Sequence, residues 1–363
     1  MKRICYLAGA STIHTVRWVN AMVAKGYEVH LITMHPAKLD QIDSAVSVHK
    51  LKVPAPIGYY ANVFQLKRLL REINPELLHV HYASGYGTLA RLAKFSPTLL
   101  STWGSDVYLF PYESKRNEKT LRKNFMAATR VSATGLALKR QTALFTPPDI
   151  QIDVVPFGID TELFRKIPIK KESGDIVIGT VKRLKEVYGI DLLLKSVARM
   201  IDQLHKEGLD DIAGQIKLLI VGEGPQISEL KEIAVQLRLE KQTEFVGAVP
   251  NVKVPEYINQ LDIYCAFSRS ESFGVAILEA SACEVPVVVS NVGGLPEVVR
   301  DGESGYITQL GDLEEMAERI KELVLDEGKR KEFGRNGREF VQSCYEWDRN
   351  VAVMADIYEQ MTN

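Results

Sequence analysis

The sequence predicts an α/β protein of two Rossmann-like domains, each built on a parallel β-sheet. Short apolar segments rich in β-branched residues alternate with segments of helical period along nearly the whole chain, which is typical of parallel sheets covered by helices. The 363 residues are too many for one hydrophobic core of ordinary size. The alternation breaks at residues 161–174, where charges, Pro168 and Gly174 replace it. We therefore expect a linker there and a domain on each side.

The first half contains seven segments that we expect to be strands, because they are short, apolar and rich in β-branched residues. A helix is expected from His14 to Lys25, ending at Gly26, which suits a left-handed C-cap. The polar stretch 111–124 is expected to be a loop that leads into a helix. The expected strands are Ile4–Ala8, Val29–Thr33, Val46–Leu51, Leu77–His81, Thr98–Thr102, Thr129–Ala133 and Val154–Val155.

After the linker the same pattern restarts, with five expected strands and two helices near the end. Ligands of such folds bind at the carboxyl ends of parallel strands, so we expect the site in the cleft between two facing domains. The expected strands are Asp175–Thr180, Lys217–Val221, Thr243–Val246, Ile263–Ala266 and Val287–Ser290, and the expected helices are Leu313–Leu325 and Glu346–Met361.

The composition is that of an ordinary globular protein, with 46% hydrophobic and 25% charged residues, which excludes disordered and collagen-like classes. The net charge of −1 gives no general attraction to nucleic acid or anionic membranes. The four cysteines form no CxxC pair and fit a reducing compartment. No segment has the roughly 20 apolar residues that cross a bilayer. We expect a cytoplasmic protein, and leave open a peripheral contact at the inner face of the membrane.

The block Glu271–Glu279 carries the strongest chemical signal. It follows an expected strand and a polar loop, and it opens an apolar run that continues through Cys283. A run that is apolar on nearly all sides predicts a buried helix, in which the carboxylate of Glu279 needs a hydrogen bond or an ion pair. If the whole block were helical, Glu271 and Glu279 would lie about 12 Å apart. Glycosidase carboxylates lie about 5–9.5 Å apart, so this pair fits hydrolysis poorly.

That separation instead suits two carboxylates that bind opposite ends of a long ligand. The helix N-terminus between them, near Phe273, offers backbone N–H groups to phosphates. A nucleotide sugar has this order of groups: hydroxyls, a diphosphate and hydroxyls. The alternative is a structural salt bridge for Glu279 and a solvated loop for Glu271.

The segment Ser268–Val299, which contains E-x7-E, resembles the signature of retaining glycosyltransferase family 4, whose members have the GT-B fold. The resemblance implies an acceptor-side domain at 1–161, a donor-side domain at 162–345, and a last helix at 346–363 that crosses back to the first domain. It continues at Val155–Asp160 with Phe164, Val221–Pro225, Phe245–Gly247, Leu78–Tyr82 and Trp103–Asp106.

The resemblance also implies roles for residues of the donor site. Glu279 would bind the ribose hydroxyls, and Glu271 would bind the hydroxyls of the transferred sugar. The other implied contacts are Ser272, Phe273, Gly274 and Val275 against the sugar and diphosphate, the loop Gly247–Val249 with Val249 against the base, and the loop Gly9, Ala10 and Ser11 near the phosphates. That last loop is not a GxGxxG turn, which disfavours dinucleotide-dependent hydride transfer.

The diphosphate requires cations, because the leaving group gains negative charge as the bond to the sugar breaks. The segment Val181–Gly189 follows an expected strand and supplies them. The family has an Arg in this turn, matched by Arg183, and a Lys just before the Gly, where this chain has Tyr188. We expect Lys185 to be the second cation, with Lys182 or a merely solvated basic loop as the alternatives.

Two glycine turns carry less specific signals. Gly222, Glu223 and Gly224 lie between an expected strand and a helix that starts at Pro225, a favoured first helical residue. Gly293-Gly294 repeats the arrangement. Each of the two turns fits a ligand loop or an ordinary tight turn. We include the turn 222–224 among the candidate contacts of the donor.

Four polar or aromatic residues of the first half carry weaker signals. His79 and His81 lie two apart on a strand and face one side of the sheet. No third and fourth ligands for zinc stand out, so we expect packing, with His81 as a substrate contact. Trp103 stands where the family often has a His. Asp106 is expected to orient the acceptor or act as a base, with capping of a loop as the alternative.

No Asp-x-Asp pair occurs in the chain, so we expect cationic side chains rather than a divalent metal at the diphosphate, and no cofactor. The basic cluster Lys115–Lys123 is expected to be a solvated face, with docking on anionic lipid headgroups as the alternative.

The predicted function is transfer of a hexosyl group, with retention, from a nucleotide sugar to a glycan or lipid-linked acceptor in polysaccharide or glycoconjugate assembly. UDP-sugar is chosen from its frequency in the family. Two alternatives remain: a nucleotide-sugar epimerase of the same fold, and a non-catalytic nucleotide-sugar-binding protein. The sequence does not identify the sugar, the acceptor or the oligomeric state.

Overall fold

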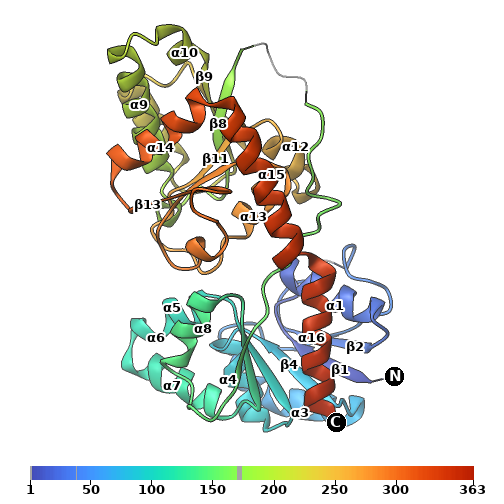
Figure 1. Cartoon of the computed structure of the whole chain (residues 1–363). Helices are drawn as coiled ribbons and strands as arrows, with labels where there is room; N and C mark the ends of the chain where they lie inside the picture. Colours follow the sequence, from blue (N-terminus) through green and yellow to red (C-terminus); the bar gives the residue numbers. More distant parts are fainter. Residues whose placement is uncertain (1, 38, 170–173) are drawn as a thin grey trace. The chain divides into compact units, whose positions relative to one another are not determined.

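The computed structural model describes residues 2–37, 39–169 and 174–363, and the chain divides into two α/β units, each around its own parallel sheet (Figure 1). Unit 1 holds the residues up to Gly158 together with Asp348–Asn363, and unit 2 holds Ile159–Trp347.

The sheet of unit 1 has seven parallel strands in the order β3-β2-β1-β4-β5-β6-β7. Every residue of the central strands β4 and β5 is buried, as expected for a parallel sheet covered by helices on both faces. The strands are β1 Arg3–Leu7, β2 Glu28–Thr33, β3 Ser47–Lys50, β4 Leu77–His81, β5 Thr98–Thr102, β6 Arg130–Ala133 and β7 Ile152–Val154, all near their expected positions.

The stretch 111–124, expected to begin as a loop, is helical over most of its length. Ser114 caps a helix by accepting from the N–H of Asn117 at 3.1 Å, and Leu121 and Phe125 bury its apolar face. The helices of unit 1 are α1 Ile13–Ala24, α2 Gly58–Ala61, α3 Val63–Ile73, α4 Gly85–Ala93, α5 Ser105–Tyr108, α6 Phe110–Glu113, α7 Lys115–Met126, α8 Leu136–Ala143 and α16 Trp347–Thr362.

The sheet of unit 2 has six parallel strands in the order β10-β9-β8-β11-β12-β13. The edge strand β13 was not predicted. It begins with Gly305, where a Cβ would lie 2.3 Å from the carbonyl oxygen of Val287. Close pairing with β12 therefore requires glycine at this position, and glycine weakens the sequence pattern by which a strand is recognised. The strands are β8 Ile176–Val181, β9 Ile216–Val221, β10 Thr243–Gly247, β11 Ile263–Ala266, β12 Val287–Ser290 and β13 Gly305–Thr308.

The long helix α15 was also not predicted, because glycines interrupt its pattern. A Cβ at Gly334 would lie 2.1 Å from the carbonyl oxygen of Glu284, so glycine allows α15 to pack closely beside α13. The helices of unit 2 are α9 Ile190–Lys206, α10 Asp210–Gln215, α11 Ile227–Gln236, α12 Val254–Ile258, α13 Val275–Ala282, α14 Leu313–Leu325 and α15 Glu327–Cys344, with 3-10 turns η1 Glu186–Tyr188, η2 Asn251–Lys253 and η3 Leu295–Glu297.

The expected linker 161–174 has no regular structure in its described residues, but its first part packs on unit 2. Phe164 is buried, and the side chain of Asn259 bonds the N–H of Ile167 and the carbonyl oxygen of Arg165. Residues 170–173 lie outside the described part of the chain.

The last helix, α16, packs on unit 1. The hydroxyl of Tyr358 lies 2.5 Å from that of Tyr6 and 2.6 Å from Nδ1 of His79. Lys2 pairs with Glu359 at 2.5 Å. The end of the chain therefore completes the unit in which the chain began.

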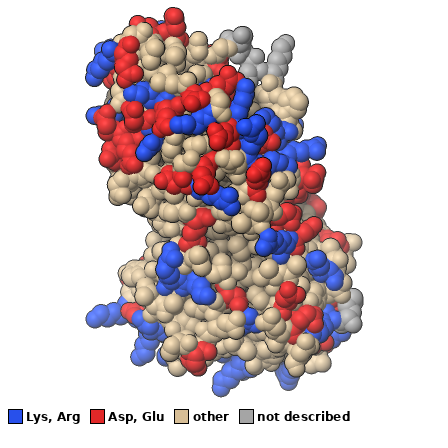
Figure 2. All heavy atoms as spheres, viewed as in Figure 1, with Lys and Arg blue, Asp and Glu red and all other residues tan. Residues whose placement is uncertain are grey.

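The surface carries both signs of charge. Figure 2 shows acidic and basic side chains interspersed over the visible face. Cys5, Cys265 and Cys283 are buried and Cys344 is exposed, all as free thiols. Across the described ranges, no helix combines the length and apolar character needed to cross a membrane.

Each sheet has one point at which the order of its strands reverses. In unit 1 the chain leaves β1 for β2 and β3 on one side, and then returns to β4 on the other. In unit 2 the same happens between β8 and β11. Ligands of open α/β sheets bind at the carboxyl ends of the strands beside such a switch point, so these two places are the first to search.

Candidate functional site

At the switch point of unit 2, the loops after β8 and β11 are joined by an ion pair. Nζ of Lys182 lies 2.5 Å from Oε2 of Glu271 and 3.2 Å from Oγ of Ser268. The side chains of Lys182 and Glu271 are only 9% and 18% exposed. The predicted sugar carboxylate Glu271 therefore faces a cation from the neighbouring loop.

The ring of Tyr188 packs against the Lys182 side of this ion pair. Nζ of Lys182 is 4.4 Å from the centroid of the Tyr188 ring, a distance typical of a cation–π contact. Burial raises the pKa of Tyr188, and the charge of Glu271 raises it further while that of Arg183 lowers it. Tyr188, which stands in place of the family lysine, thus lies among all three charged groups.

The loop that carries Glu271 is held by close main-chain contacts. The N–H of Gly294 donates to the carbonyl oxygen of Glu271 at 3.0 Å, and a Cβ at Gly293 would lie 1.8 Å from that oxygen. The hydroxyl of Ser290 donates to the carbonyl oxygen of Ser268 at 2.6 Å. The Gly293-Gly294 turn therefore supports the Glu271 loop through its backbone.

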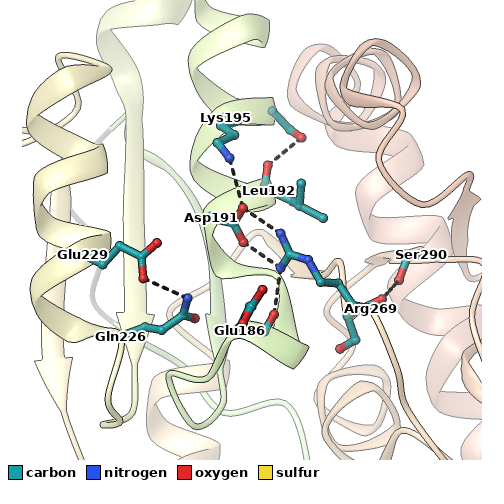
Figure 3. A network of polar contacts seen from close by, with 10 residues as sticks. Glu186, Asp191, Leu192, Lys195, Gln226, Glu229, Arg269 and Ser290 are labelled. Carbon is teal, nitrogen blue, oxygen red and sulfur yellow. Dashed lines mark hydrogen bonds and ion pairs between the residues drawn. The ribbon is translucent and has the colours of Figure 1, made fainter.

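A second ion pair ties the same two loops together (Figure 3). Arg269, in the loop after β11, makes a two-pronged pair with Asp191 at the start of α9, with both N···O distances 2.8 Å. Its guanidinium also donates to the carbonyl oxygen of Glu186 at 2.7 Å. Two parallel charge-assisted bonds fix orientation as well as distance. Arg269 and Asp191 therefore brace the loop of Lys182 against the loop of Glu271.

The helix α13 starts later than the sequence analysis assumed. It begins at Val275, after Gly274 at φ 108°, so the stretch from Glu271 to Gly274 is a loop and the 12 Å helical spacing does not apply. The first amides of a helix have no intrahelical partner, and here the first bond between turns is that from Ile277 to Gly274. The N-terminus of α13 thus follows directly on the loop that contains Glu271.

Most of helix α13 is buried, as predicted, but Glu279 is not fully buried. Ile277, Leu278 and the last turn of α13 are buried, whereas Val275, Ala276 and Glu279 are partly exposed. These three positions lie on one side of the helix, because residues three and four apart are neighbours on a helical surface. The carboxylate of Glu279 therefore belongs to a partly open face that begins at the N-terminus of α13.

Arg183 lines an open pocket of about 470 Å³ beside the turn 222–224. Gly222 adopts φ 139°, and a Cβ there would lie 1.8 Å from the carbonyl oxygen of Lys182. The N–H of Leu184 donates to the carbonyl oxygen of Glu223 at 2.9 Å. The glycine turn thus packs main chain against main chain and positions Arg183. The pocket is lined by Arg183, Gly222, Glu223, Gly224, Ile227, Lys231, Phe245, Val246 and Gly247.

Two residues predicted for this region do not line the pocket. Gly247 lines the pocket, while Val249, expected against the base, lies two residues further and is half-buried. Lys185, expected as the second cation, is exposed, whereas Lys182 is the cation against Glu271. Lys231, which no sequence pattern indicated, also lines the pocket, and its Nζ lies 5.9 Å from the centroid of the Phe245 ring.

In unit 1 the loop after β1 buries one of its three expected contacts. Ser11 is exposed and Gly9 is half-buried, but Ala10 is buried and its N–H donates to Oγ1 of Thr33 at 3.2 Å. Ser11 is therefore the member of this loop best placed to meet a ligand.

His81 and Asp106 are both buried, which agrees with the packing expected of His81. Nδ1 of His81 lies 3.2 Å from Oγ1 of Thr15, and the residue is 1% exposed beneath Trp103, at 4.3 Å between ring centroids. Burial raises the pKa of Asp106, opposed by backbone hydrogen bonds, among them those from Ala83, Gly104 and Trp103. A buried carboxylate occupied in this way fits the capping alternative rather than a base that contacts an acceptor.

Trp103 belongs to an aromatic cluster that sequence analysis did not find. The His14 ring stacks on Phe157 at 4.0 Å and meets Trp103 edge-on at 5.8 Å. Burial lowers the pKa of His14 to about 4, helped by the charge of Arg17, so His14 is neutral at pH 7. Residues 14, 103 and 157 lie far apart in the sequence, so no local pattern could have predicted the cluster.

Within the described part of the chain, no group of three or more His, Cys, Asp or Glu side chains is placed to hold a metal ion. The charges around Glu271 are instead cationic side chains, which suit an anionic ligand.

Two family models match the chain. Residues 161–340 match the model described as Glycosyl transferases group 1, and residues 3–135 match the model described as Glycosyl transferase 4-like. The chain is 25% identical over 374 residues to N-acetyl-alpha-D-glucosaminyl L-malate synthase of Bacillus anthracis, covering 98% of this chain and 95% of that protein. It is 27% identical over 305 residues to a GDP-mannose-dependent alpha-(1-6)-phosphatidylinositol monomannoside mannosyltransferase of Mycobacterium tuberculosis, covering 80% and 78%.

Two solved structures resemble the whole chain. The sucrose-phosphate synthase of Thermosynechococcus elongatus superposes with a TM-score of 0.84 at 19% identity, covering 99% of both chains. Anabaena HepE in complex with UDP and glucose superposes with a TM-score of 0.81 at 18% identity, covering 99% of this chain and 100% of that one. These likenesses show the fold, which is the predicted GT-B fold.

Proposed function

We propose that this chain, which belongs to the group 1 glycosyl transferases, transfers a hexosyl group from a nucleotide sugar to a glycan or a lipid-linked acceptor and retains the anomeric configuration. The observation that carries the proposal is the arrangement at the switch point of unit 2. Glu271 lies in the loop that leads into α13, Glu279 lies on the partly exposed face of that helix, and Arg183 lines a pocket at the end of the adjacent strands.

Each part of this arrangement matches a part of the donor. Carboxylates are good acceptors for sugar hydroxyls, and a helix N-terminus is a good site for phosphate oxygens. We assign the hydroxyls of the transferred sugar to Glu271, the diphosphate to the start of α13 and to Arg183, and the ribose to Glu279. The pocket beside Gly247 is the proposed place of the base.

The reaction needs stabilisation of the leaving group. As the bond between C1 of the sugar and the phosphate oxygen breaks, negative charge builds on that oxygen, and fixed cations lower the barrier most where charge builds. The acceptor oxygen then bonds to C1, and its proton passes to the departing phosphate. In this assignment Arg183 and the amides of α13 act on the leaving group, and no metal ion takes part.

The names of similar proteins guide the choice of donor. HepE binds UDP and UDP-glucose in its crystals, and the mycobacterial relative is named for GDP-mannose. We propose a UDP-sugar and keep GDP-sugars as the second series to test.

For the acceptor, the surface of unit 1 offers one clue. The basic side chains of α7 are exposed, and clusters of Lys and Arg bind anionic headgroups. We propose that these side chains let the enzyme reach a lipid-linked acceptor at the inner face of the membrane.

The first test is binding of UDP and of GDP, each measured with and without a chelator. We expect one of them to raise the melting temperature, since a ligand at a hundred times its Kd adds about 2.7 kcal/mol of stability. Loss of the shift in chelator would contradict metal independence. A protein that binds neither nucleotide would refute the donor site itself.

Two variants then separate binding from turnover. Glu279→Ala should weaken nucleotide binding by about ten- to a hundredfold, the worth of a charged hydrogen bond. Arg183→Ala should lower kcat by about a hundredfold or more. Arg199→Ala, an exposed arginine on α9 paired with Glu314, is the control and should change neither quantity.

The alternatives give other outcomes in the same assays. Sugar released from the donor without any acceptor would favour an epimerase, and binding without turnover on any acceptor pool would favour a non-catalytic protein. Unchanged kinetics in both Glu279→Ala and Arg183→Ala would contradict the assignment.

A further inference from the structure

The loop after β8 carries three cations, and the structure places each of them differently. Arg183 lines the pocket beside Gly222. Lys185 is exposed at the start of η1. Lys182 is the one that turns inward, with a side chain only 9% exposed. A charged ammonium group is costly to withdraw from water unless it is paired, so the position of Lys182 requires an explanation.

Its surroundings compensate that cost with polar contacts and with an aromatic face. An ammonium group has three N–H donors. Nζ donates to Oε2 of Glu271 at 2.5 Å and to Oγ of Ser268 at 3.2 Å, which leaves one donor for a ligand oxygen. The ring of Tyr188 lies 4.4 Å from Nζ and favours the positive charge. These contacts hold the ammonium in one position before any ligand arrives.

The loops around the ammonium are themselves fixed. The backbone N–H of Arg269 donates to the carbonyl oxygen of Val187 at 2.7 Å, and the pair between Arg269 and Asp191 joins the same two segments. A cation on so rigid a frame keeps its geometry through a reaction, which is the condition for electrostatic stabilisation of a transition state.

We infer that Lys182 is the second cation of the donor diphosphate, that it acts at the sugar end of the diphosphate, and that Tyr188 and Glu271 hold it there. The inference rests on the proposed function. Glu271 is the carboxylate assigned to the transferred sugar, so a cation bound to it stands beside the bond that breaks. Charge builds on the phosphate oxygen of that bond, and Lys182 has a donor left to meet it.

The inference also explains how the chain works with Tyr188 where the family has a lysine. A cation at position 188 would stand against the ammonium of Lys182, and the two like charges would repel each other. The aromatic ring removes that repulsion and adds attraction. Lys182 and Tyr188 therefore act together: the cation that the family has just before the glycine stands in this chain at the start of the loop.

The test is an exchange of positions, measured as kcat, as KM for the donor, and as calorimetric affinity for UDP and GDP. Lys182→Met should lower kcat by about a hundredfold, since it removes charge stabilisation in the transition state. Lys182→Met combined with Tyr188→Lys should recover at least tenfold of that loss, because lysine at 188 is of similar length to tyrosine and returns a cation to the same place. A purely structural role for Lys182 would not be rescued in this way.

Two further variants complete the test. Lys185→Met should lower kcat less than fivefold, and Lys206→Met, an exposed lysine at the far end of α9, should match the wild type. A melting curve of each variant shows whether it folds. If Lys182→Met is unstable, the kcat of the double variant shows whether a cation at position 188 restores turnover.

The inference is overturned if Lys182→Met keeps kcat within twofold, if Lys185→Met loses more activity than Lys182→Met, or if the double variant stays as slow as Lys182→Met. Each of these results leaves the proposed function standing, because the wild type still turns over. If the wild type neither binds UDP or GDP nor transfers sugar, the proposed function and this inference fall together.

Discussion

At the scale of single residues, unit 1 contains histidines that burial keeps neutral. Both ring nitrogens of His79 have partners, with Nδ1 2.6 Å from the hydroxyl of Tyr358 and Nε2 2.6 Å from Oγ of Ser101. Burial lowers the pKa of His79 to about 3. Burial also lowers the pKa of His81, and protonation of the neighbouring His79 or His14 would lower that pKa further. A neutral imidazole ring can accept one hydrogen bond and donate another, and the ring of His79 does both in this core.

The stability of unit 1 should therefore fall in mild acid. The unfolded chain binds a proton at each such histidine below about pH 6.5, while the folded chain does not, so unfolding takes up protons. The free energy of unfolding should drop by about 1.4 kcal/mol per pH unit for each histidine as the pH falls below 6.5. For His79 this loss continues down to its folded pKa of about 3.

Urea unfolding at pH 7.0 and 5.5, followed by tryptophan fluorescence, measures this loss; Trp18 and Trp103 both report on unit 1. His79→Gln keeps a donor and an acceptor but does not titrate, so its stability should depend less on pH. If the free energy of unfolding fell equally with pH in the wild type and in His79→Gln, His79 would not be the source of the acid sensitivity.

At the scale of elements, the site of unit 2 depends on loops that approach each other through their backbones. Gly222 lies against the carbonyl of Lys182, and Gly293 lies against that of Glu271. These glycines are required by close approach, because a Cβ at either position would overlap main-chain atoms. The glycine turns therefore position the loops of Lys182 and Glu271 through backbone contacts alone.

Gly222→Ala should separate the loop of Arg183 from the turn 222–224. The added Cβ would lie 1.8 Å from a carbonyl oxygen, and φ 139° is strained for any other residue. We expect a loss of about 3 kcal/mol or more in the free energy of unfolding, above the 1–3 kcal/mol of backbone strain alone, and at least tenfold weaker binding of UDP or GDP.

Gly208→Ala is the matched control, since Gly208 has φ 76° and open space around its Cα. Gly208→Ala should lower the free energy of unfolding by the cost of backbone strain alone and should leave the affinity for UDP or GDP unchanged. Equal effects of the two substitutions on affinity would contradict the role given to the turn.

At the scale of the whole molecule, the chain ends in the unit where it starts. Helix α16 follows a helix of unit 2 but packs on unit 1 through Tyr358, Glu359 and Gln360. Tyr358 is fully buried between Tyr6 and His79. Folding of unit 1 therefore needs both ends of the sequence, while unit 2 is continuous.

Tyr358→Phe should destabilise unit 1 alone. It removes a hydroxyl that bonds Tyr6 and His79, and each polar group left unpaired in the core costs about 1–3 kcal/mol. In calorimetry we expect one of two unfolding transitions to move to lower temperature while the other stays. Tyr60→Phe, at an exposed position of unit 1, should move neither. A shift of both transitions would show that the units do not unfold independently.

The fold was predictable because its signals are local. Strands such as β4 and β5 are short apolar runs, and helix α1 has a capping threonine and a closing glycine. Where a glycine serves close packing, as Gly305 does in β13 and Gly334 does in α15, the same residue hides the element from pattern analysis.

The sequence by itself determined the two-sheet α/β architecture, the GT-B family of the chain, and the positions of Glu271, Glu279 and Arg183 as candidates. Only the tertiary structure decided that Lys182 and not Lys185 meets Glu271, that Glu279 is partly exposed, and that His81 and Asp106 are enclosed. The physical reason is distance along the chain: Lys182 and Glu271 are 89 residues apart, as Asp191 and Arg269 are 78 apart. Periodicity and caps act over a few residues, whereas the partner of a buried charge depends on which strands lie side by side.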